Sequence, residues 1–121
     1  MTQKLTGKIA VVTGAGRGVG REIARSLAAC GAQVALVARS TDQLQETERL
    51  IAESGGIAWV IQADVSTHTG IELVRKNVEG RWGRTVMLNN TAGVFGPIQM
   101  IKDSDPMRWI ETLTINTVAA Y

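Results

Sequence analysis

Four short apolar runs, each followed by a segment with helical spacing, constrain the fold more than any other feature of this sequence. The runs are Ile9–Val12, Val34–Val37, Ile57–Ile61 and Val86–Leu88. The first two runs are continuous, which is typical of strands that are covered on both faces in a parallel sheet. Parallel strands need crossover connections, and helices usually supply them. The pattern therefore predicts the α/β class, with a doubly wound parallel sheet that carries helices on both faces.

The segments between the runs carry signals for helix starts and ends. Ser-x-x-Gln is a capping pattern at a helix N-terminus, and glycine often follows the last turn. Proline is tolerated in a first turn. Helices are therefore expected from Val19 to Cys30, from the capping sequence Ser40–Gln43 to Gly55, after Thr67 through Val78, and from Ser104 or Asp105 to Tyr121.

Composition excludes several classes of protein. The 121 residues are 45% hydrophobic, and 13 Lys and Arg stand against 11 Asp and Glu, for a net charge of +2. This charge is too small, and too scattered, to favour nucleic acid as a partner. No apolar run is long enough for a membrane span or a signal-peptide core. We expect one domain over residues 1–121, located in the cytoplasm, with no membrane partner and no metal site.

A glycine-rich stretch follows the first apolar run directly. Gly14, Gly18 and Gly20 form the pattern Thr-Gly-x-x-x-Gly-x-Gly between the predicted strand and helix. Glycines there allow a sharp turn and a close approach to a pyrophosphate, while the helix N-terminus offers N–H groups to the anion. We interpret the stretch as a dinucleotide loop in which Gly16 is a spacer. A glycine-rich turn without a ligand is the alternative.

Together with three further motifs, this loop resembles the short-chain dehydrogenases/reductases, which are nicotinamide-dependent oxidoreductases with a Rossmann-type fold. The further motifs are Asp64-Val65, matching the family's adenine contact; Asn90-Thr91-Ala92-Gly93, with Thr91 in place of a second asparagine; and Asn116, matching an asparagine of the catalytic set. The resemblance covers essentially the whole chain. The resemblance and the charge pattern together assign the following residues to the cofactor: Gly14, Arg17, Gly18, Val19, Gly20, Arg39, Asp64, Val65, Asn90, Ala92 and Gly93. Asn116 is the catalytic candidate.

Each of these motifs also has an ordinary structural explanation when taken alone. Asp64 also fits a residue that precedes a helix capped by Ser66. Asn90 fits a turn residue at the end of a strand, and Asn116 fits a polar residue on a helix face. Their joint occurrence in this order favours the functional interpretation. Replacement of the second asparagine by Thr91 removes one expected side-chain hydrogen bond, but cofactor binding is expected to survive it.

The end of the second apolar run favours NADP over NAD. An acidic residue at this place accepts hydrogen bonds from the ribose of NAD. Here Ala38 and Arg39 follow the run, and an arginine is a bidentate donor for a 2′-phosphate. Arg17 on the glycine loop is expected to reach the same phosphate. The alternatives are that both arginines are solvated surface charges, or that Asp42 replaces the missing acid.

The resemblance implies hydride transfer to or from a carbonyl or alcohol, but also residues that this chain does not contain. The family uses a serine and a Tyr-x-x-x-Lys motif that follow the fifth strand, and the only tyrosine here is Tyr121. We therefore expect the chain to be the cofactor-binding half of a reductase, ending before the fifth strand and inactive alone. A non-catalytic dinucleotide-binding or regulatory protein is the alternative from another class. A methyltransferase is a weaker one, because its cofactor usually needs an acid where Ala38 stands.

The last predicted helix suggests a partner. Trp109, Ile110 and Leu113 share its apolar face, and nothing upstream is expected to cover them. In the family this helix contributes to an oligomer interface. We expect a homo-oligomer formed through this helix and a small carbonyl or alcohol as substrate, whose identity the sequence does not indicate.

Overall fold

The computed structural model describes residues 4–85, 87–93 and 100–118, and it contains a four-stranded parallel sheet. The strand order is β3-β2-β1-β4, with every described pair parallel. The predicted parallel sheet is confirmed, and each strand begins or ends within two residues of its apolar run. Val86, the predicted start of the fourth strand, lies outside the described residues. The strands are β1 (Ile9–Thr13), β2 (Gln33–Ala38), β3 (Ile57–Gln62) and β4 (Met87–Asn90).

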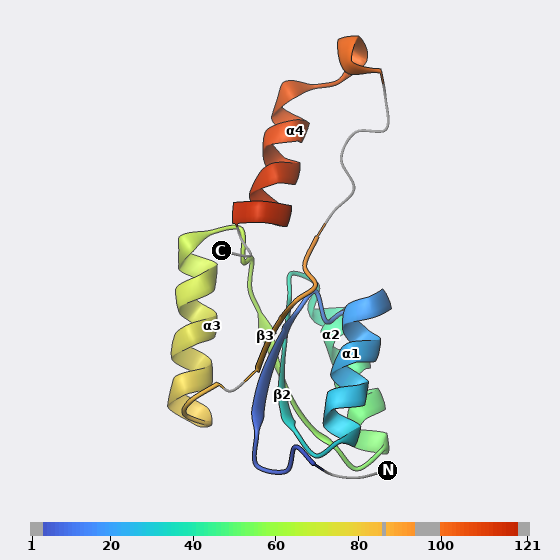
Figure 1. Ribbon diagram of the computed structural model, residues 1–121, viewed down its shortest axis with the longest axis vertical. Coiled ribbons are helices and arrows are strands. Elements are labelled where there is room, and N and C mark those ends of the chain that lie inside the picture. The colour runs from blue at the N-terminus through green and yellow to red at the C-terminus, as the bar shows by residue number, and fades with distance from the viewer. Residues whose placement is uncertain (1–3, 86, 94–99, 119–121) are drawn as a thin grey trace.

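Helices alternate with the strands and cover both faces of the sheet. Figure 1 shows α1 and α2 on one face and α3 on the other. Ser40 caps α2 by accepting a hydrogen bond from the backbone N–H of Gln43, as predicted. These helices are α1 (Gly18–Ala29), α2 (Thr41–Glu53) and α3 (His68–Arg81).

The cap of α3 differs from the expected one. Thr67, and not Ser66, is the N-cap, and its hydroxyl accepts a hydrogen bond of 3.0 Å from the backbone N–H of Gly70. Ser66 is unavailable as the cap because its hydroxyl donates to the carboxylate of Asp64 at 2.6 Å. The helix therefore starts one residue further from the strand than a Ser66 cap would place it.

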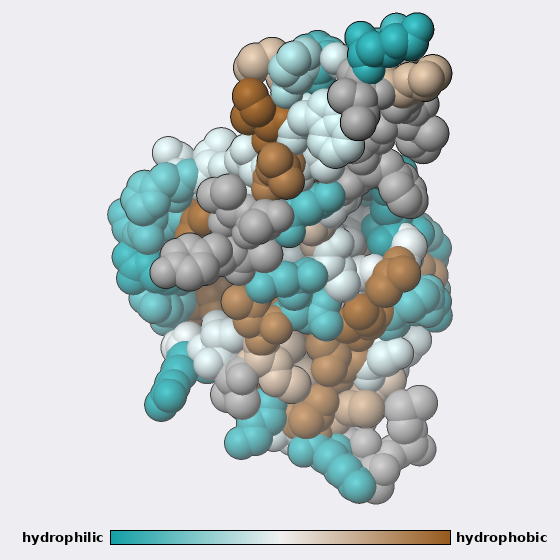
Figure 2. Space-filling view, turned by 45° about the horizontal axis from the view of Figure 1, so that its top comes forward, coloured by the Kyte–Doolittle hydropathy of each residue, from teal (hydrophilic) through white to brown (hydrophobic). Residues whose placement is uncertain are grey.

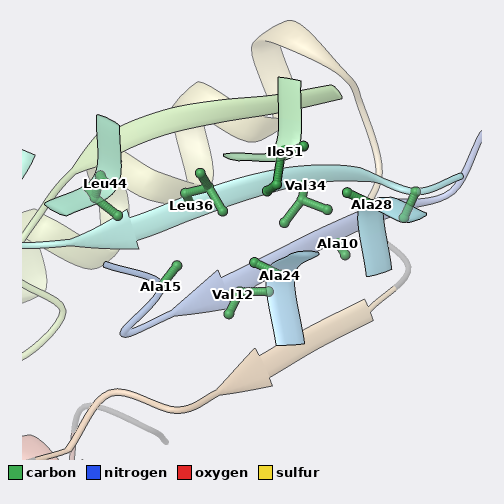
Figure 3. Packing of buried hydrophobic residues seen from close by; sticks show 10 residues of the cluster. Ala10, Val12, Ala15, Ala24, Ala28, Val34, Leu36, Leu44 and Ile51 are labelled. Atoms are coloured by element: carbon green, nitrogen blue, oxygen red, sulfur yellow. The ribbon is translucent and has the colours of Figure 1, made fainter. Parts of the chain in front are cut away.

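Two hydrophobic clusters pack on the two faces of the sheet. Figure 3 shows the first, in which alanines of α1 and the larger Leu44 and Ile51 of α2 pack on side chains of β1 and β2. The second joins β1, β2 and β3 to Val78 of α3. Burial was predicted for the first two strands, and it holds for the central β1 and β2. β3 and β4 are less buried, because these are the outer strands of the described sheet.

The last helix, α4 (Pro106–Leu113), extends away from the carboxyl edge of the sheet (Figure 1). Asp105 caps it, accepting from the backbone N–H of Met107 at 2.9 Å, with Pro106 in the first turn as expected. The α-helix ends at Leu113 and continues as a π-helical turn, η2 (Thr114–Val118). A helix to Tyr121 was predicted, and Tyr121 lies outside the described residues. Within the described ranges no helix is long and apolar enough to cross a membrane.

Candidate dinucleotide site

A cavity of about 630 Å³ lies at the carboxyl ends of the strands. Here the chain runs from β1 to β2 on one side and reaches β4 on the other, which is the switch point where open α/β sheets bind ligands. Every predicted cofactor-binding residue except Asn90 lines this cavity. The lining comprises Gly14, Gly16–Gly20, Val37–Ser40, Gln43, Ala63–Ser66, Thr91–Gly93 and Ile115.

The glycine loop is tightly folded between β1 and α1. Gly14 and Gly18 have φ angles of +65° and +56°, which favour glycine. A Cβ atom added at Gly20 would lie 2.0 Å from the carbonyl oxygen of Gly14. Helix α1 therefore starts in direct contact with the turn that precedes it, and only glycine at position 20 permits this distance.

Gly16 is more than a spacer. A Cβ atom at this position would lie 2.9 Å from Cβ of Gln43, so the loop needs a glycine here to lie against α2. The spacing pattern gave no sign of this constraint, because Gln43 is remote in the sequence. The interpretation of Gly16 as an unremarkable spacer is therefore corrected by the packing of the loop.

The N-terminus of α1 differs from those of the other α-helices in the described part of the chain. Side chains of Ser40, Thr67 and Asp105 cap α2, α3 and α4. The N-cap of α1 is Arg17, whose side chain makes no capping hydrogen bond, and the first turn holds no acidic residue. The free N–H groups and positive end of this helix dipole therefore adjoin the cavity without a side-chain anion.

Two arginines and one aspartate are the charged residues in the cavity lining. Arg17 and Arg39 are both exposed, at the loop and at the end of β2. The backbone of Arg39 is fixed because its carbonyl accepts a 3.0 Å hydrogen bond from the Gln62 side chain. Asp42, the possible substitute acid, is exposed and does not line the cavity. The end of β2 thus presents a cation and no carboxylate.

Asp64 follows β3 and is held in place by its neighbours. Its Oδ1 accepts hydrogen bonds from the hydroxyl and the backbone N–H of Ser66, at 2.6 and 3.0 Å. These bonds, led by the hydroxyl and assisted by the charge of Arg39, hold the pKa of Asp64 below its ordinary value. The carboxylate is therefore ionised at neutral pH and oriented at the cavity wall.

Thr91 joins the ends of β4 and β1. Its hydroxyl donates to the backbone carbonyl of Thr13, while the hydroxyl of Thr13 accepts from the backbone N–H of Ala92 at 3.2 Å. The asparagine that Thr91 replaces was expected to leave a hydrogen bond unmade. The threonine hydroxyl makes a hydrogen bond of its own at this place and ties the two strand ends together.

The two predicted asparagines lie in different places. Asn90 is exposed on β4 and lines a separate groove between β4 and α3, so the structure does not bring it to the cavity. Asn116 lies in η2, and its Oδ1 is 3.2 Å from where a Cβ of Gly93 would stand. It is thus beside the β4 edge of the cavity. Phe95–Pro97 follow the fourth strand, where the family resemblance predicts an edge of the substrate pocket, and they lie outside the described residues.

A sequence model described as short chain dehydrogenase matches residues 8–121. The chain belongs to the short chain dehydrogenase family. Among curated relatives, the trihydroxynaphthalene reductase PfmaI of Pestalotiopsis fici is 39% identical over 116 residues, which are 93% of this chain and 40% of that protein. The predicted family is therefore confirmed, and with it the Rossmann-type fold.

Solved structures of family members agree with this fold. A metagenomic short-chain oxidoreductase in complex with NADP is 38% identical, with a TM-score of 0.92 over 97% of this chain and 53% of that one. An NAD⁺-bound xylitol dehydrogenase is 30% identical, with a TM-score of 0.92 over 97% of this chain and 45% of that one. The chain thus spans about half the length of the family members that it matches.

Several residues that line the cavity were not assigned to the cofactor from the sequence. Ser40, Gln43, Ser66, Thr91 and Ile115 also line the cavity. Ser40 and Gln43 were recognised only as a helix cap. A cap that directly follows the end of β2 necessarily lies at the same sheet edge as the glycine loop, and this was the available signal. Ile115 carries no such signal, because only the turn after α4 returns it to the cavity.

Proposed function

We propose that this chain supplies the NADP(H)-binding part of an oxidoreductase that transfers hydride between NADP(H) and a carbonyl or alcohol. One observation carries the proposal. The uncapped N-terminus of α1 and the cationic Arg17 and Arg39 face one cavity at the switch point of a parallel sheet. An anionic ligand that spans the loop and the end of β2 satisfies both features.

The residues present fit a dinucleotide. The pyrophosphate is assigned to the loop, where glycines at positions 14, 18 and 20 leave the backbone without side chains and the N–H groups of α1 donate to no N-cap side chain. The adenine is assigned to Asp64 and Val65 after β3, and the nicotinamide to Ala92 and Gly93 after β4. When bound, the nicotinamide supplies the hydride chemistry.

The preference for NADP rests on the charge at the end of β2. Neither β2 nor the first turn of α2 contributes a carboxylate to the cavity lining near Arg39. Asp42 lies in that turn but does not line the cavity. An NADPH 2′-phosphate would gain charge-assisted hydrogen bonds from Arg39 and Arg17, whereas NADH offers neutral hydroxyls. Family members occur with either cofactor, as the NADP-bound oxidoreductase and the NAD⁺-bound xylitol dehydrogenase illustrate.

Titration of the 121-residue chain with NADPH and NADH tests this proposal. NADPH is expected to bind more tightly, and Arg39→Ala to weaken NADPH by roughly 10- to 100-fold while changing NADH by less than about threefold. Arg25→Gln is the matched control, since Arg25 is a partly exposed arginine of α1 that pairs with Glu22 at 3.1 Å and does not line the cavity. Equal affinities for the two cofactors in the parent chain would refute the NADP preference.

Catalysis is proposed to need residues that these 121 do not include. Asn116, beside Gly93 at the β4 edge of the cavity, is the candidate residue of the catalytic set in this chain. The 121 residues contain no Tyr-x-x-x-Lys. A tyrosine with an ordinary pKa near 10 is a poor acid at neutral pH. We expect the chain to bind NADPH without oxidising it in the presence of carbonyl compounds, and absorbance at 340 nm measures this directly.

Self-association through α4 is the proposed interaction. Trp109, Ile110 and Leu113 are each at least 43% exposed, and no residue of α4 is buried. Figure 2 shows hydrophobic surface in the upper part of the molecule, where α4 lies. A helix with one apolar face and no cover is expected to bury that face against a second copy.

A further inference from the structure

We propose that Arg21 and Thr47 are positioning residues that hold the glycine loop in the conformation that binds a pyrophosphate. This inference deepens the proposed function and rests on it. Neither residue lines the cavity, and neither was singled out from the sequence. Both lie behind the loop, where they connect it to α2.

The connection consists of hydrogen bonds made by the hydroxyl of Thr47 and by the guanidinium of Arg21. Thr47 is fully buried, and its Oγ1 lies 2.8 Å from the carbonyl oxygen of Ala15, to which it donates. Arg21 donates from Nε to Thr47 Oγ1 at 3.0 Å and from Nη2 to the carbonyl of Gly16 at 2.5 Å. A longer bond of 3.3 Å reaches the carbonyl of Gln43 on α2. Two consecutive loop carbonyls are thus fixed against the helix.

Peptide geometry converts these bonds into an orientation of the loop N–H groups. A trans peptide holds its C=O and N–H in opposite directions. Since the carbonyls of Ala15 and Gly16 are turned to Thr47 and Arg21, the N–H groups of Gly16 and Arg17 are turned away from them. Among the described residues these two N–H groups make no backbone hydrogen bond. Gly16 and Arg17 both line the cavity, so the turned N–H groups are available to an anion there.

The charge of Arg21 lies close to the positive end of the α1 dipole. A cation near the first turn of a helix opposes the positive end of the helix dipole, at a cost of about 0.3–1 kcal/mol. Arg21 begins the second turn of α1, with its backbone N–H bonded to the carbonyl of Arg17. Three acceptors on the loop and on α2 compensate this unfavourable placement.

The same bonds couple two parts of the cavity. Gln43 lines the cavity beside Arg39 and Ser40, and its carbonyl is near Arg21 and Thr47 alike. The glycine loop and the start of α2 therefore move together. A ligand that orders the loop also fixes the end of β2 where the 2′-phosphate is proposed to bind.

Amide hydrogen exchange tests the anchoring without any ligand. The N–H of Ala15 donates to Val37, and the N–H of Ala63 donates to Ala38 on the other side of β2, which makes Ala63 a matched control. Thr47→Val keeps the shape and removes the hydroxyl, and is expected to accelerate exchange at Ala15 by about 10-fold while Ala63 changes by less than about twofold. Thr47→Ser is expected to restore the parent rate. Unchanged exchange at Ala15, or equal acceleration at both amides, would overturn the anchoring.

Ligand titration then tests the consequence for binding. Adenosine 2′-phosphate has the ribose phosphate of NADPH but lacks its pyrophosphate. Thr47→Val and Arg21→Met are each expected to weaken NADPH by about 10-fold and adenosine 2′-phosphate by less than about twofold, with Thr47→Ser again close to the parent. The double variant is expected to lose no more than the worse single variant, because both residues act through one network.

The two proposals fail in different ways. If the parent chain binds no NADPH, the proposed function is refuted, whereas the exchange experiment still decides whether Arg21 and Thr47 anchor the loop. If the parent chain binds NADPH but Thr47→Val weakens NADPH and adenosine 2′-phosphate equally, or weakens neither, the positioning role is overturned and the proposed function stands.

Discussion

The two sides of the sheet that flank β1 differ sharply in how their apolar residues are covered. On the β2 side, α1 and α2 bury Val34, Leu36 and Leu44 completely. On the β4 side, Leu88 remains 62% exposed, and no residue of α4 is buried. The strands also differ in composition, since β2 is apolar from Val34 to Ala38, whereas Asn89 and Asn90 form the second half of β4. The difference in coverage lies in whether a helix from the described chain packs on them.

The two walls of the cavity differ in the same way. The glycine-loop wall is fixed by backbone contacts and by the network of Arg21 and Thr47 behind it. At the β4 wall, hydrogen bonds of Thr13 and Thr91 join the ends of β1 and β4. We infer that the β2 side carries most of the stability of the chain and forms the more rigid wall, where phosphate is proposed to bind, whereas the β4 side contributes surface for further contacts.

The largest expected effect compares two leucines across β1. Leu36→Ala removes a fully buried side chain between β2 and the helices, and should lower the free energy of unfolding by about 2–5 kcal/mol. Leu88→Ala removes a mostly exposed side chain on β4, and should change it by less than about 0.5 kcal/mol. Urea denaturation followed by circular dichroism measures both. Similar losses for the two variants would break the comparison.

Alanine substitutions at two glycines on opposite walls of the cavity test the same comparison. Gly20→Ala places a Cβ atom 2.0 Å from the backbone oxygen of Gly14, so the loop must move, at a cost of about 1–3 kcal/mol and with loss of NADPH binding. Gly93→Ala meets only the end of the Asn116 side chain, at 3.2 Å. Its cost should stay under about 1 kcal/mol, since the neighbouring atom is the end of a side chain and not backbone. Thermal unfolding and NADPH titration distinguish the two, and a Gly93 variant as damaged as Gly20→Ala would contradict the rigid-wall interpretation.

A smaller effect concerns the acid dependence of the β2 side. The pKa of Asp64 is lowered in the folded chain, so the unfolded chain binds this proton more tightly. The resulting stabilisation is present above the ordinary aspartate pKa of about 3.9, and is lost as the pH falls through the lower folded pKa. Asp64→Asn keeps the acceptor for Ser66 and removes the charge, so stability should fall less steeply below pH 4. Chemical denaturation between pH 2.5 and about 6 measures the slope, and an unchanged slope would contradict a folded-state role of the carboxylate.

The smallest effect on stability is expected at α4. Leu113→Asp introduces a charge on an exposed face, and should change the free energy of unfolding by less than about 0.5 kcal/mol. Its expected effect is on association instead, with a shift to the monomer in sedimentation or size-exclusion experiments. Glu111→Gln, on an exposed position of the same helix, is the control. A parent chain that is monomeric at all concentrations tested would contradict self-association through α4.

Much of the fold followed from local patterns. Continuous apolar runs, a Ser-x-x-Gln cap and glycines at helix ends depend on interactions within a few residues, so the sequence alone was sufficient to predict the elements and their parallel arrangement. The coverage of β3 and β4 was not predictable in this way. An apolar run has the same pattern whether its strand lies at the centre or at the edge of the sheet, and the strand order decides which.

The residues of the site also fall into those that the sequence could predict and those that it could not. The glycine loop, Arg39 and Asp64 could be found because each directly follows a predicted strand, and the carboxyl ends of parallel strands meet at one edge. The constraint on Gly16 and the network of Arg21 and Thr47 could not be found from the sequence. They depend on contacts between α1, the loop and α2, up to 32 residues apart in the sequence.

By itself, the sequence determined the succession of strands and helices, the place of the glycine loop and the charge at the end of β2, because backbone geometry and charge are properties of short segments. Only the tertiary structure decided which strands are buried on both faces, that Asn90 lies away from the cavity, and that a buried threonine and an arginine hold the loop from behind. The physical reason is that burial and hydrogen bonding between distant segments exist only after the helices have packed on the sheet.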